Sequence, residues 1–184
     1  MAVQRGFGSI IASIIGIVIV VVAVVIILKL VRPEPQVKLL IEKSIELRNA
    51  TNPVEKANLI SSLDDEVAGS KSQEVKDQWD RMMLCLPTTC PDEAYLDMVL
   101  VTVAAFEKDI PDSALLINII ATSKYWGDAE HLLDFSKALS IANDQIDKLN
   151  NRKAEKIWQQ IVECNGTCPD KNSLYFDVIK AIVQ

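Results

Sequence analysis

Apolar residues fill the start of the chain and then recur at helical spacing as far as its end. Between Arg5 and Lys29 lie 23 residues without a charge, dominated by Ile and Val. A helix of this length reaches about 34 Å at about 1.5 Å per residue, enough to cross a hydrocarbon core of about 30 Å. The run is longer than the apolar region of a cleaved signal and does not end in a small-x-small site. We therefore predict that residues 1–31 are an uncleaved membrane anchor, which contacts the bilayer through residues 8–31 and offers a helical face for oligomer formation.

Behind the anchor the chain becomes mixed in polarity. Residues 32–36 contain Pro33 and Pro35, and each proline removes a backbone donor and biases its predecessor towards extended geometry. A short, stiff spacer is predicted there. Residues 37–184 are long enough for one hydrophobic core and lack the strict apolar–polar alternation of a half-buried strand. They are predicted to form a single all-α domain of about eight helices.

Apolar spacing and capping residues place these helices. Asn52 followed by Pro53 is typical of a cap and a first helical residue, so a helix is expected from there to Gly69. The other helices are predicted at 37–48, 72–85 and 91–106, around 115–117, over 132–149, around Trp158 and from Asp170 onward. The apolar positions expected to be buried include Val37, Leu40, Ile41, Ile45, Val75, Trp79, Met82, Met83, Leu86, Leu132, Phe135, Leu139, Ala142, Ile146 and Leu149.

One sequence cassette occurs twice in the domain. Trp79-Asp-Arg-Met-Met-Leu-Cys-Leu-Pro-Thr-Thr-Cys-Pro-Asp returns as Trp158-Gln-Gln-Ile-Val-Glu-Cys-Asn-Gly-Thr-Cys-Pro-Asp. The copies lie 79 residues apart at the tryptophan, and Leu39 and Leu115 begin similar apolar triplets 76 residues apart. Two repeats are therefore predicted, residues 37–110 and 111–184, which stack as helical hairpins in a solenoid-like manner.

All four cysteines belong to the two cassettes. Two cysteines with three or four residues between them at a turn between helices can reach the Cα separation of roughly 4.4–6.8 Å that a disulfide needs. The duplication favours local pairs, Cys85 with Cys90 and Cys164 with Cys168. An alternative is one zinc ion held by all four thiolates, although these spacings are looser than the C-x2-C of zinc modules. A third is redox chemistry, because Cys90 and Cys168 precede predicted helix N-termini, but no βαβ unit accompanies them.

Charge and composition exclude several functions. The segment from Gln36 to Gln184 has 24 acidic and 16 basic residues, a balance that should repel nucleic acids, so no nucleic-acid partner is expected. Its three glycines cannot form a phosphate-binding loop, and the only histidine, His131, has no nucleophile motif beside it. We expect neither enzymatic activity nor a cofactor.

One aromatic pair stands outside the predicted core. Tyr125 and Trp126 precede Gly127 in a predicted loop rather than on an apolar helix face. They are the best candidates for a contact surface towards an unknown protein partner, and partial burial beneath the loop is the alternative.

Two features of the sequence bear on the compartment, and they disagree. The paired cysteines are typical of an oxidising environment, and the triplets beginning at Asn49 and Asn165 are acceptor sites for N-glycosylation. The positive residues after the anchor, Lys29 and Arg32 among them, instead favour a cytoplasmic domain. We give the cysteines more weight and predict a single-pass protein of the cell membrane with its domain outside the cytoplasm.

The stretch Arg5-Gly-Phe-Gly-Ser-Ile-Ile-Ala-Ser-Ile-Ile15 resembles the start of archaeal type IV pilins and archaellin-like proteins. The resemblance covers about 25 residues. It implies cleavage near Gly6 by a prepilin peptidase, after which residues 8–28 would form the helix that assembles in a filament core.

Three functional hypotheses follow from the sequence. The first is a membrane-anchored, extracytoplasmic helical domain that acts as a binding or scaffold module with two local disulfides. The second is a pilin-like filament subunit, and the third is a cytoplasmic-facing zinc module with four cysteine ligands.

Overall fold

The computed structural model describes residues 35–164 and 170–184. The predicted membrane anchor, the site of pilin-like cleavage and most of the spacer lie outside the described residues, as do Asn165 and Cys168. Among the helices that are described, none is long and apolar enough to cross a membrane.

The prediction of an all-α domain is confirmed for the described residues, which form eight helices and no strand. The helices are α2 (Pro35–Asn49), α3 (Pro53–Gly69), α4 (Gln73–Met83), α5 (Asp92–Ala105), α6 (Ser113–Tyr125), α7 (Leu132–Ile146), α8 (Arg152–Glu163) and α9 (Lys171–Val183).

Local capping signals set several of these boundaries. The Asn52 side chain accepts hydrogen bonds from two backbone N–H groups in the first turn of α3, and Pro53 is the first residue of that helix. Ser72 and Asn151 each accept one from the backbone N–H three residues further on, at the starts of α4 and α8. The spacer prediction is wrong at its end. Helix α2 already begins at Pro35, since proline lacks only an N–H that the first turn leaves unpaired.

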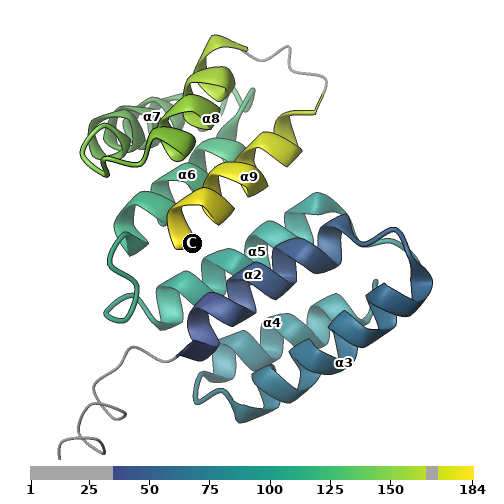
Figure 1. The fold of residues 1–184 in the computed structure, drawn as a ribbon. Coiled ribbons are helices and arrows are strands. Elements are labelled where there is room, and N and C mark those ends of the chain that lie inside the picture. The colour runs from purple at the N-terminus through teal and green to yellow at the C-terminus, as the bar shows by residue number, and fades with distance from the viewer. Residues whose placement is uncertain (1–34, 165–169) are drawn as a thin grey trace, which may run out of the picture. The chain divides into compact units, whose positions relative to one another are not determined.

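The helices form two groups of four with equivalent neighbours. In α2–α5 the first helix packs on the second and fourth, and the third packs on the second and fourth. The same pairs occur in α6–α9. Figure 1 shows the two groups as separate clusters of the same domain. We call α2–α5 the first repeat and α6–α9 the second repeat.

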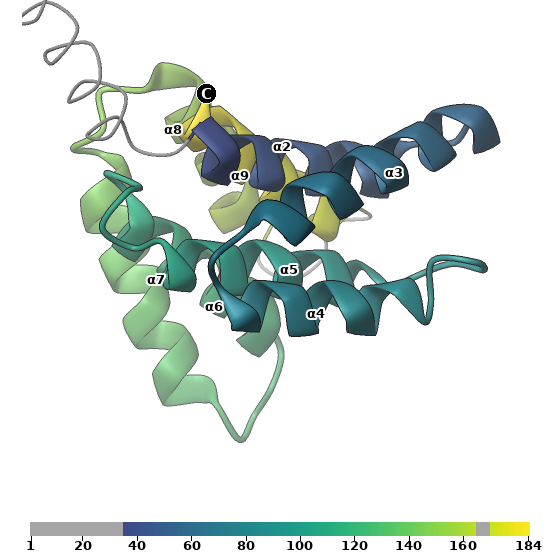
Figure 2. The ribbon, with the colours of Figure 1, turned by 90° about the horizontal axis from the view of Figure 1, so that it is seen from below.

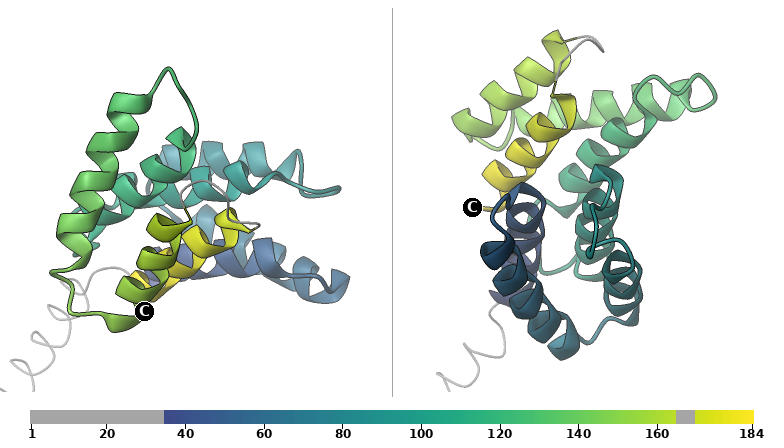
Figure 3. Two further views of the ribbon diagram at one scale, coloured as in Figure 1. Left: turned by 90° about the horizontal axis from the view of Figure 1, so that it is seen from above. Right: turned by 90° about the vertical axis from the view of Figure 1, so that its right-hand side faces the viewer.

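The two repeats meet through a reciprocal interface. Helix α2 packs on α9, and α5 packs on α6, so in both contacts the first helix of one repeat meets the fourth helix of the other. Helices α2, α5, α6 and α9 thus form a closed central ring, flanked by the α3–α4 and α7–α8 hairpins (Figures 1 and 3). This differs from the predicted solenoid-like stack, in which the two outermost members would not touch. Central helices bury adjacent positions, such as Ile119 with Ile120 and Val178 with Ile179, and therefore need neighbours on two sides.

The interiors of the repeats match position by position. Trp79 and Trp158 are each 2% exposed. The buried pairs are Leu40/Leu115, Ile41/Leu116 and Ile45/Ile120 at an interval of 75 residues, Leu63/Ala142, Val67/Ile146, Val75/Ala154 and Met82/Ile161 at 79, and Tyr95/Tyr175, Leu96/Phe176, Met98/Val178, Val99/Ile179 and Val103/Val183 at 80. The interval of 76 predicted from Leu39 and Leu115 is one residue too long, because burial aligns Leu40 with Leu115. Since the interval rises from 75 to 79 between the first and second helices of the repeats, the second repeat has four extra residues around the α6–α7 loop.

Candidate functional site

The cassette tryptophans belong to the core. The indole N–H of Trp79 donates to Asp64 Oδ1 at 2.9 Å, and that of Trp158 donates to Asn143 Oδ1 at 2.6 Å. Donor and acceptor are 15 residues apart in both repeats, so each tryptophan joins its helix to the preceding one. A buried indole needs one such acceptor. The two tryptophans of the cassette are therefore structural residues.

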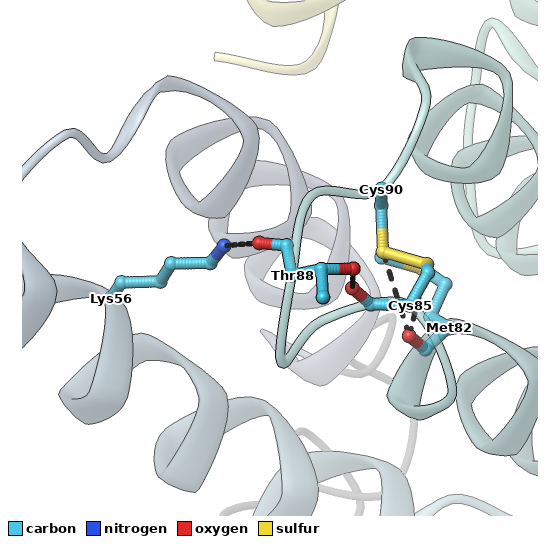
Figure 4. Close-up of a disulfide and its surroundings, with 5 residues drawn as sticks. All are labelled: Lys56, Met82, Cys85, Thr88 and Cys90. Carbon is cyan, nitrogen blue, oxygen red and sulfur yellow. Dashed lines mark hydrogen bonds between the residues drawn. A yellow bond between two sulfur atoms is a disulfide. The ribbon is translucent and has the colours of Figure 1, made fainter.

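The first cysteine pair forms the predicted disulfide at the end of α4. Cys85 and Cys90 are bonded with their Cα atoms 5.0 Å apart, and Cys90 is buried. The Lys56 amino group donates to the Thr88 carbonyl inside the closed loop at 3.5 Å, and both sulfurs lie close to the Met82 carbonyl (Figure 4). The bond joins the end of α4 to the approach of α5, which is the corner that the sequence predicts it to hold.

The disulfide also bears on the zinc alternative. The sulfurs of Cys85 and Cys90 are bonded to each other, so they are not two thiolates facing a metal ion. Within residues 35–164 and 170–184 there is no cluster of three or more potential metal ligands. The pair Cys164–Cys168 remains a prediction, because Cys168 lies outside the described residues.

A charged cluster sits where α2, α5 and α9 meet. Arg48 Nε donates to Asp92 Oδ1 at 2.9 Å and Nη2 donates to Asp92 Oδ2 at 3.1 Å, a bidentate pair. Arg48 Nη1 donates to Ser173 Oγ at 2.9 Å, and the guanidinium lies 4.9 Å from the centre of the Phe176 ring. Asp170 lies at 4.0 Å from Nη2. Arg48 of the first repeat therefore contacts the N-terminal ends of both α5 and α9, the helices that follow the two cassettes.

Ionisation in this cluster favours the charged pair. The hydrogen bond from Arg48 is the main cause that lowers the pKa of Asp92, and a hydrogen bond from Asn172 at 2.9 Å lowers it further against the opposing effect of burial. The same contact raises the pKa of Arg48. The cluster thus stays ionised at neutral pH and ties α2 to α5 and α9.

The cluster departs from the symmetry of the repeats. Asp92 and Asp170 are equivalent cassette residues and both face Arg48, but the position equivalent to Arg48, 75 residues later, is Ser123. Ser123 lines a polar cavity of about 570 Å³ beside the cluster. The cavity is lined by Asp92, Glu93, Leu96, Ser123, Lys124, Trp126, Asp170, Lys171 and Asn172. Three of its charged groups form ion pairs within the protein: Lys124 pairs with Asp97, and Asp92 and Asp170 pair with Arg48. We interpret this region as a clamp between the repeats.

An apolar pocket of about 450 Å³ lies in the second repeat, between the α6–α7 loop, α7 and α8. It is lined by Tyr125, Trp126, Gly127, Asp128, Ala129, Leu132, Phe135, Leu139 and Val162. Two of its lining side chains are largely open to solvent, Leu132 at 61% and Val162 at 39% exposed, and Leu133, which follows Leu132 on α7, is 86% exposed. Such side chains around one concavity are typical of a surface that binds another molecule.

The loop that forms the pocket wall is held by its own contacts. Gly127 has φ of 80°, a left-handed conformation that suits glycine. The Asp128 carboxylate accepts from the Glu130 backbone N–H at 2.9 Å and lies 2.8 Å from His131 Nδ1. The contact with His131 is the main cause that lowers the pKa of Asp128. The His131 ring stacks on Tyr125 with centroids 4.9 Å apart. These contacts fix the conformation of the turn, which projects from the helices in Figure 2.

Trp126 stands between the pocket and the polar cavity. Its ring meets Phe135 edge-on at 5.2 Å, and the Lys171 amino group lies 5.5 Å from its centre. Burial lowers the pKa of Lys171. Both Tyr125 and Trp126 are half-buried and line the pocket, so the structure brings the two predicted contact residues into one wall.

The sequence prediction for α7 is wrong at its exposed end. Leu132 was expected in the core but faces solvent, while Phe135 and Leu139 are half-buried and line the pocket. The core of α7 is instead formed by Ala138, Ala142 and Ile146. In α4, Met83 was also expected in the core and is 39% exposed. Apolar periodicity identifies a helix face, but it does not say whether a second layer covers that face.

The predicted glycosylation acceptor Asn49 is exposed at the end of α2. Its Oδ1 accepts a hydrogen bond from Arg48 Nη1 at 3.0 Å. Modification of Asn49 remains a prediction, and Asn165 lies outside the described residues.

No family model, curated protein or solved structure matches this chain.

Proposed function

We propose that this protein is a non-catalytic, membrane-anchored binding protein whose second repeat receives an apolar segment of a protein partner. The observation that carries the proposal is the difference between the repeats. The extra residues around the α6–α7 loop supply Trp126 to Asp128, which wall a pocket that also contains Phe135. The equivalent of Phe135 in the first repeat is Lys56, which reaches across to the disulfide loop instead.

The placement of the binding domain follows from the N-terminus and the cysteines. We propose that residues 8–31 hold the protein in the cell membrane and that the domain faces an oxidising space outside the cytoplasm. The long uncharged run supports the anchor, and the Cys85–Cys90 bond supports the compartment, because such bonds persist where thiols are not kept reduced.

A second candidate function is a pilin-like filament subunit, which the sequence around Arg5 and Gly6 favours. It differs from the first candidate because it predicts that the N-terminus is cleaved near Gly6. The intact mass of the protein purified from membranes decides between them: loss of the first six or so residues supports the filament subunit, and an N-terminus at Met1 or Ala2 supports the anchored binding protein.

Site-specific photocrosslinking in native membranes tests the binding function. A photoreactive side chain at Leu133 should give a discrete adduct with one protein, whereas the same group at Val54, the exposed equivalent in the first repeat, should not. The substitution Phe135→Lys places a cation in the pocket, as in the first repeat, and should abolish the adduct. Equal adducts from both positions, or an adduct that survives Phe135→Lys, would contradict the proposal.

A further inference from the structure

Resting on the proposed binding function, we infer that the partner segment is an amphipathic helix whose apolar face is flanked by Lys or Arg. The pocket of about 450 Å³ has room for a few apolar side chains rather than for a folded domain. An amphipathic helix presents such anchors at spacings of three and four residues, which is a common way to occupy an apolar groove.

Four carboxylates lie on the elements that form this pocket. Asp128 lines it, Glu130 and Asp134 are exposed on the loop and the first turn of α7, and Glu163 follows Val162 on α8. We call Asp128, Glu130, Asp134 and Glu163 the acidic rim. Asp134 and Glu163 make no ion pair with any residue in the described part of the chain.

The cations on the same elements offset this charge only in part. The Lys171 amino group lies over the Trp126 ring, and Lys137 lies one turn beyond Leu133 on α7. The cations of α8, Arg152, Lys153 and Lys156, lie in the first half of that helix, seven or more residues before Glu163. The His131 ring is paired with the Asp128 carboxylate. The rim therefore keeps an acidic excess, and a partner with cations beside its apolar residues is electrostatically complementary to it.

The equivalent surface of the first repeat lacks both features. Val54 and Met83 are exposed there at the positions of Leu133 and Val162, but Lys56 replaces Phe135. The position equivalent to Glu163 is Leu84, which is 85% exposed. Acidic and basic residues alternate around it, namely Glu55, Lys56, Asp80 and Arg81. At these equivalent positions, acidic charge and an open apolar pocket thus coincide in the second repeat and not in the first.

Two synthetic peptides test the inference with the full chain in neutral phosphatidylcholine nanodiscs. Both are about four helical turns long, with leucines along one face and a photoreactive group among them. In one the leucines are flanked by Lys, and in the other by Glu. We expect the Lys peptide to bind at least about tenfold more tightly, to weaken as salt is raised, and to crosslink to residues 125–139. Empty nanodiscs measure binding to lipid.

Matched variants locate the charge effect. Asp134→Lys combined with Glu163→Lys should reverse the preference between the peptides, while Glu55→Lys, at the position equivalent to Asp134, should leave it unchanged. Phe135→Lys should prevent both peptides from crosslinking in the pocket.

The other possible results of these experiments contradict different parts of the proposal. Equal binding of both peptides in the pocket would contradict the charge inference and leave the binding function standing. Failure of both peptides to crosslink there would contradict the inferred helix as the occupant, while the crosslinking from Leu133 in native membranes decides the function separately. If the wild-type chain were dimeric in nanodiscs and Phe135→Lys made it monomeric, the occupant would be a second copy of the chain, which would also overturn the inference.

Discussion

The first and second repeats share the pattern of their interior and differ at the surface around the α6–α7 loop. Trp79 and Trp158 are buried to the same extent and bond to acceptors at the same distance along the chain, on the preceding helix. The loops that follow α2 and α6 differ, because residues 50–52 join one pair of helices and residues 126–131 join the other. Burial therefore keeps the two repeats alike inside, while a surface loop is free to lengthen and to build a pocket.

Replacement of the cassette tryptophans should give the largest effect on stability. We expect Trp79→Ala and Trp158→Ala each to lower the free energy of unfolding by about 3–5 kcal/mol, since both leave a large cavity and remove the hydrogen bond to the preceding helix. Denaturant unfolding of the full chain in mild detergent, followed by circular dichroism, measures both. A cost below about 1 kcal/mol for either variant would break the equivalence of the two interiors.

Removal of a disulfide should cost less. Replacing Cys85 and Cys90 together with Ser should lower the free energy of unfolding by about 2 kcal/mol, because the closed loop is short. The same double replacement of Cys164 and Cys168 sharpens the comparison. A similar cost, together with a native mass lower by two hydrogens per pair, would show that the second repeat has an equivalent disulfide. Alkylation of all four cysteines in the native protein would contradict both disulfides.

The Arg48 clamp predicts that the free energy of unfolding depends on pH through the ionisation of Asp92. Because Arg48 lowers the pKa of Asp92 in the folded protein, the folded state binds protons less readily than the unfolded chain. This stabilisation is present above the ordinary carboxyl pKa of about 3.9 and is lost as pH falls through the lower folded pKa.

Arg48→Met should therefore lower the free energy of unfolding by about 1–2 kcal/mol at neutral pH and by less in acid. Unfolding measured at pH 7 and near pH 3 checks the sign. The matched exchange Lys124→Met breaks a half-exposed pair with Asp97 and should cost less than about 1 kcal/mol. A loss from Arg48→Met that grows as pH falls would contradict the clamp.

Exposed apolar residues should give the smallest effect on stability. Leu133→Asp and Val54→Asp replace equivalent side chains that are 86% and 69% exposed, so each should change the free energy of unfolding by less than about 0.5 kcal/mol. Only Leu133→Asp should weaken crosslinking of the partner from a photoreactive group at Leu132. Loss of this adduct in both variants would mean that the two surfaces bind together.

Local signals in the sequence predict most of the helix boundaries. The Asn52-Pro53 start of α3 and its end at Gly69 are both confirmed, because caps act within one turn and need no tertiary context. The buried face of α2 at Val37, Leu40 and Ile45 is confirmed as well. Because the cassette occurs twice, the sequence also predicts the Cys85–Cys90 pair, which is confirmed.

Long-range contacts account for the features that sequence reasoning missed. Arg48, Asp92 and Ser173 are distant along the chain, and no local pattern marks them as one cluster. The sequence predicts the pocket only in part, because Trp126 is an aromatic residue in a predicted loop, whereas Phe135 has the same spacing as the core positions of α7. The interval between repeats gives a signal that could have located the pocket, since its increase from 75 to 79 marks the longer α6–α7 loop.

Shortening that loop tests the central claim most directly. Residues 126–131 are replaced by Ala-Thr-Asn, the sequence of residues 50–52, in the full chain in native membranes, with a photoreactive group at Leu133. We predict that the protein stays folded, with an unfolding temperature within a few degrees of the parent, and that the adduct from Leu133 disappears. An adduct that persists on the folded chain, or a chain that no longer folds, would contradict the view that this loop is a binding element added to an otherwise shared interior.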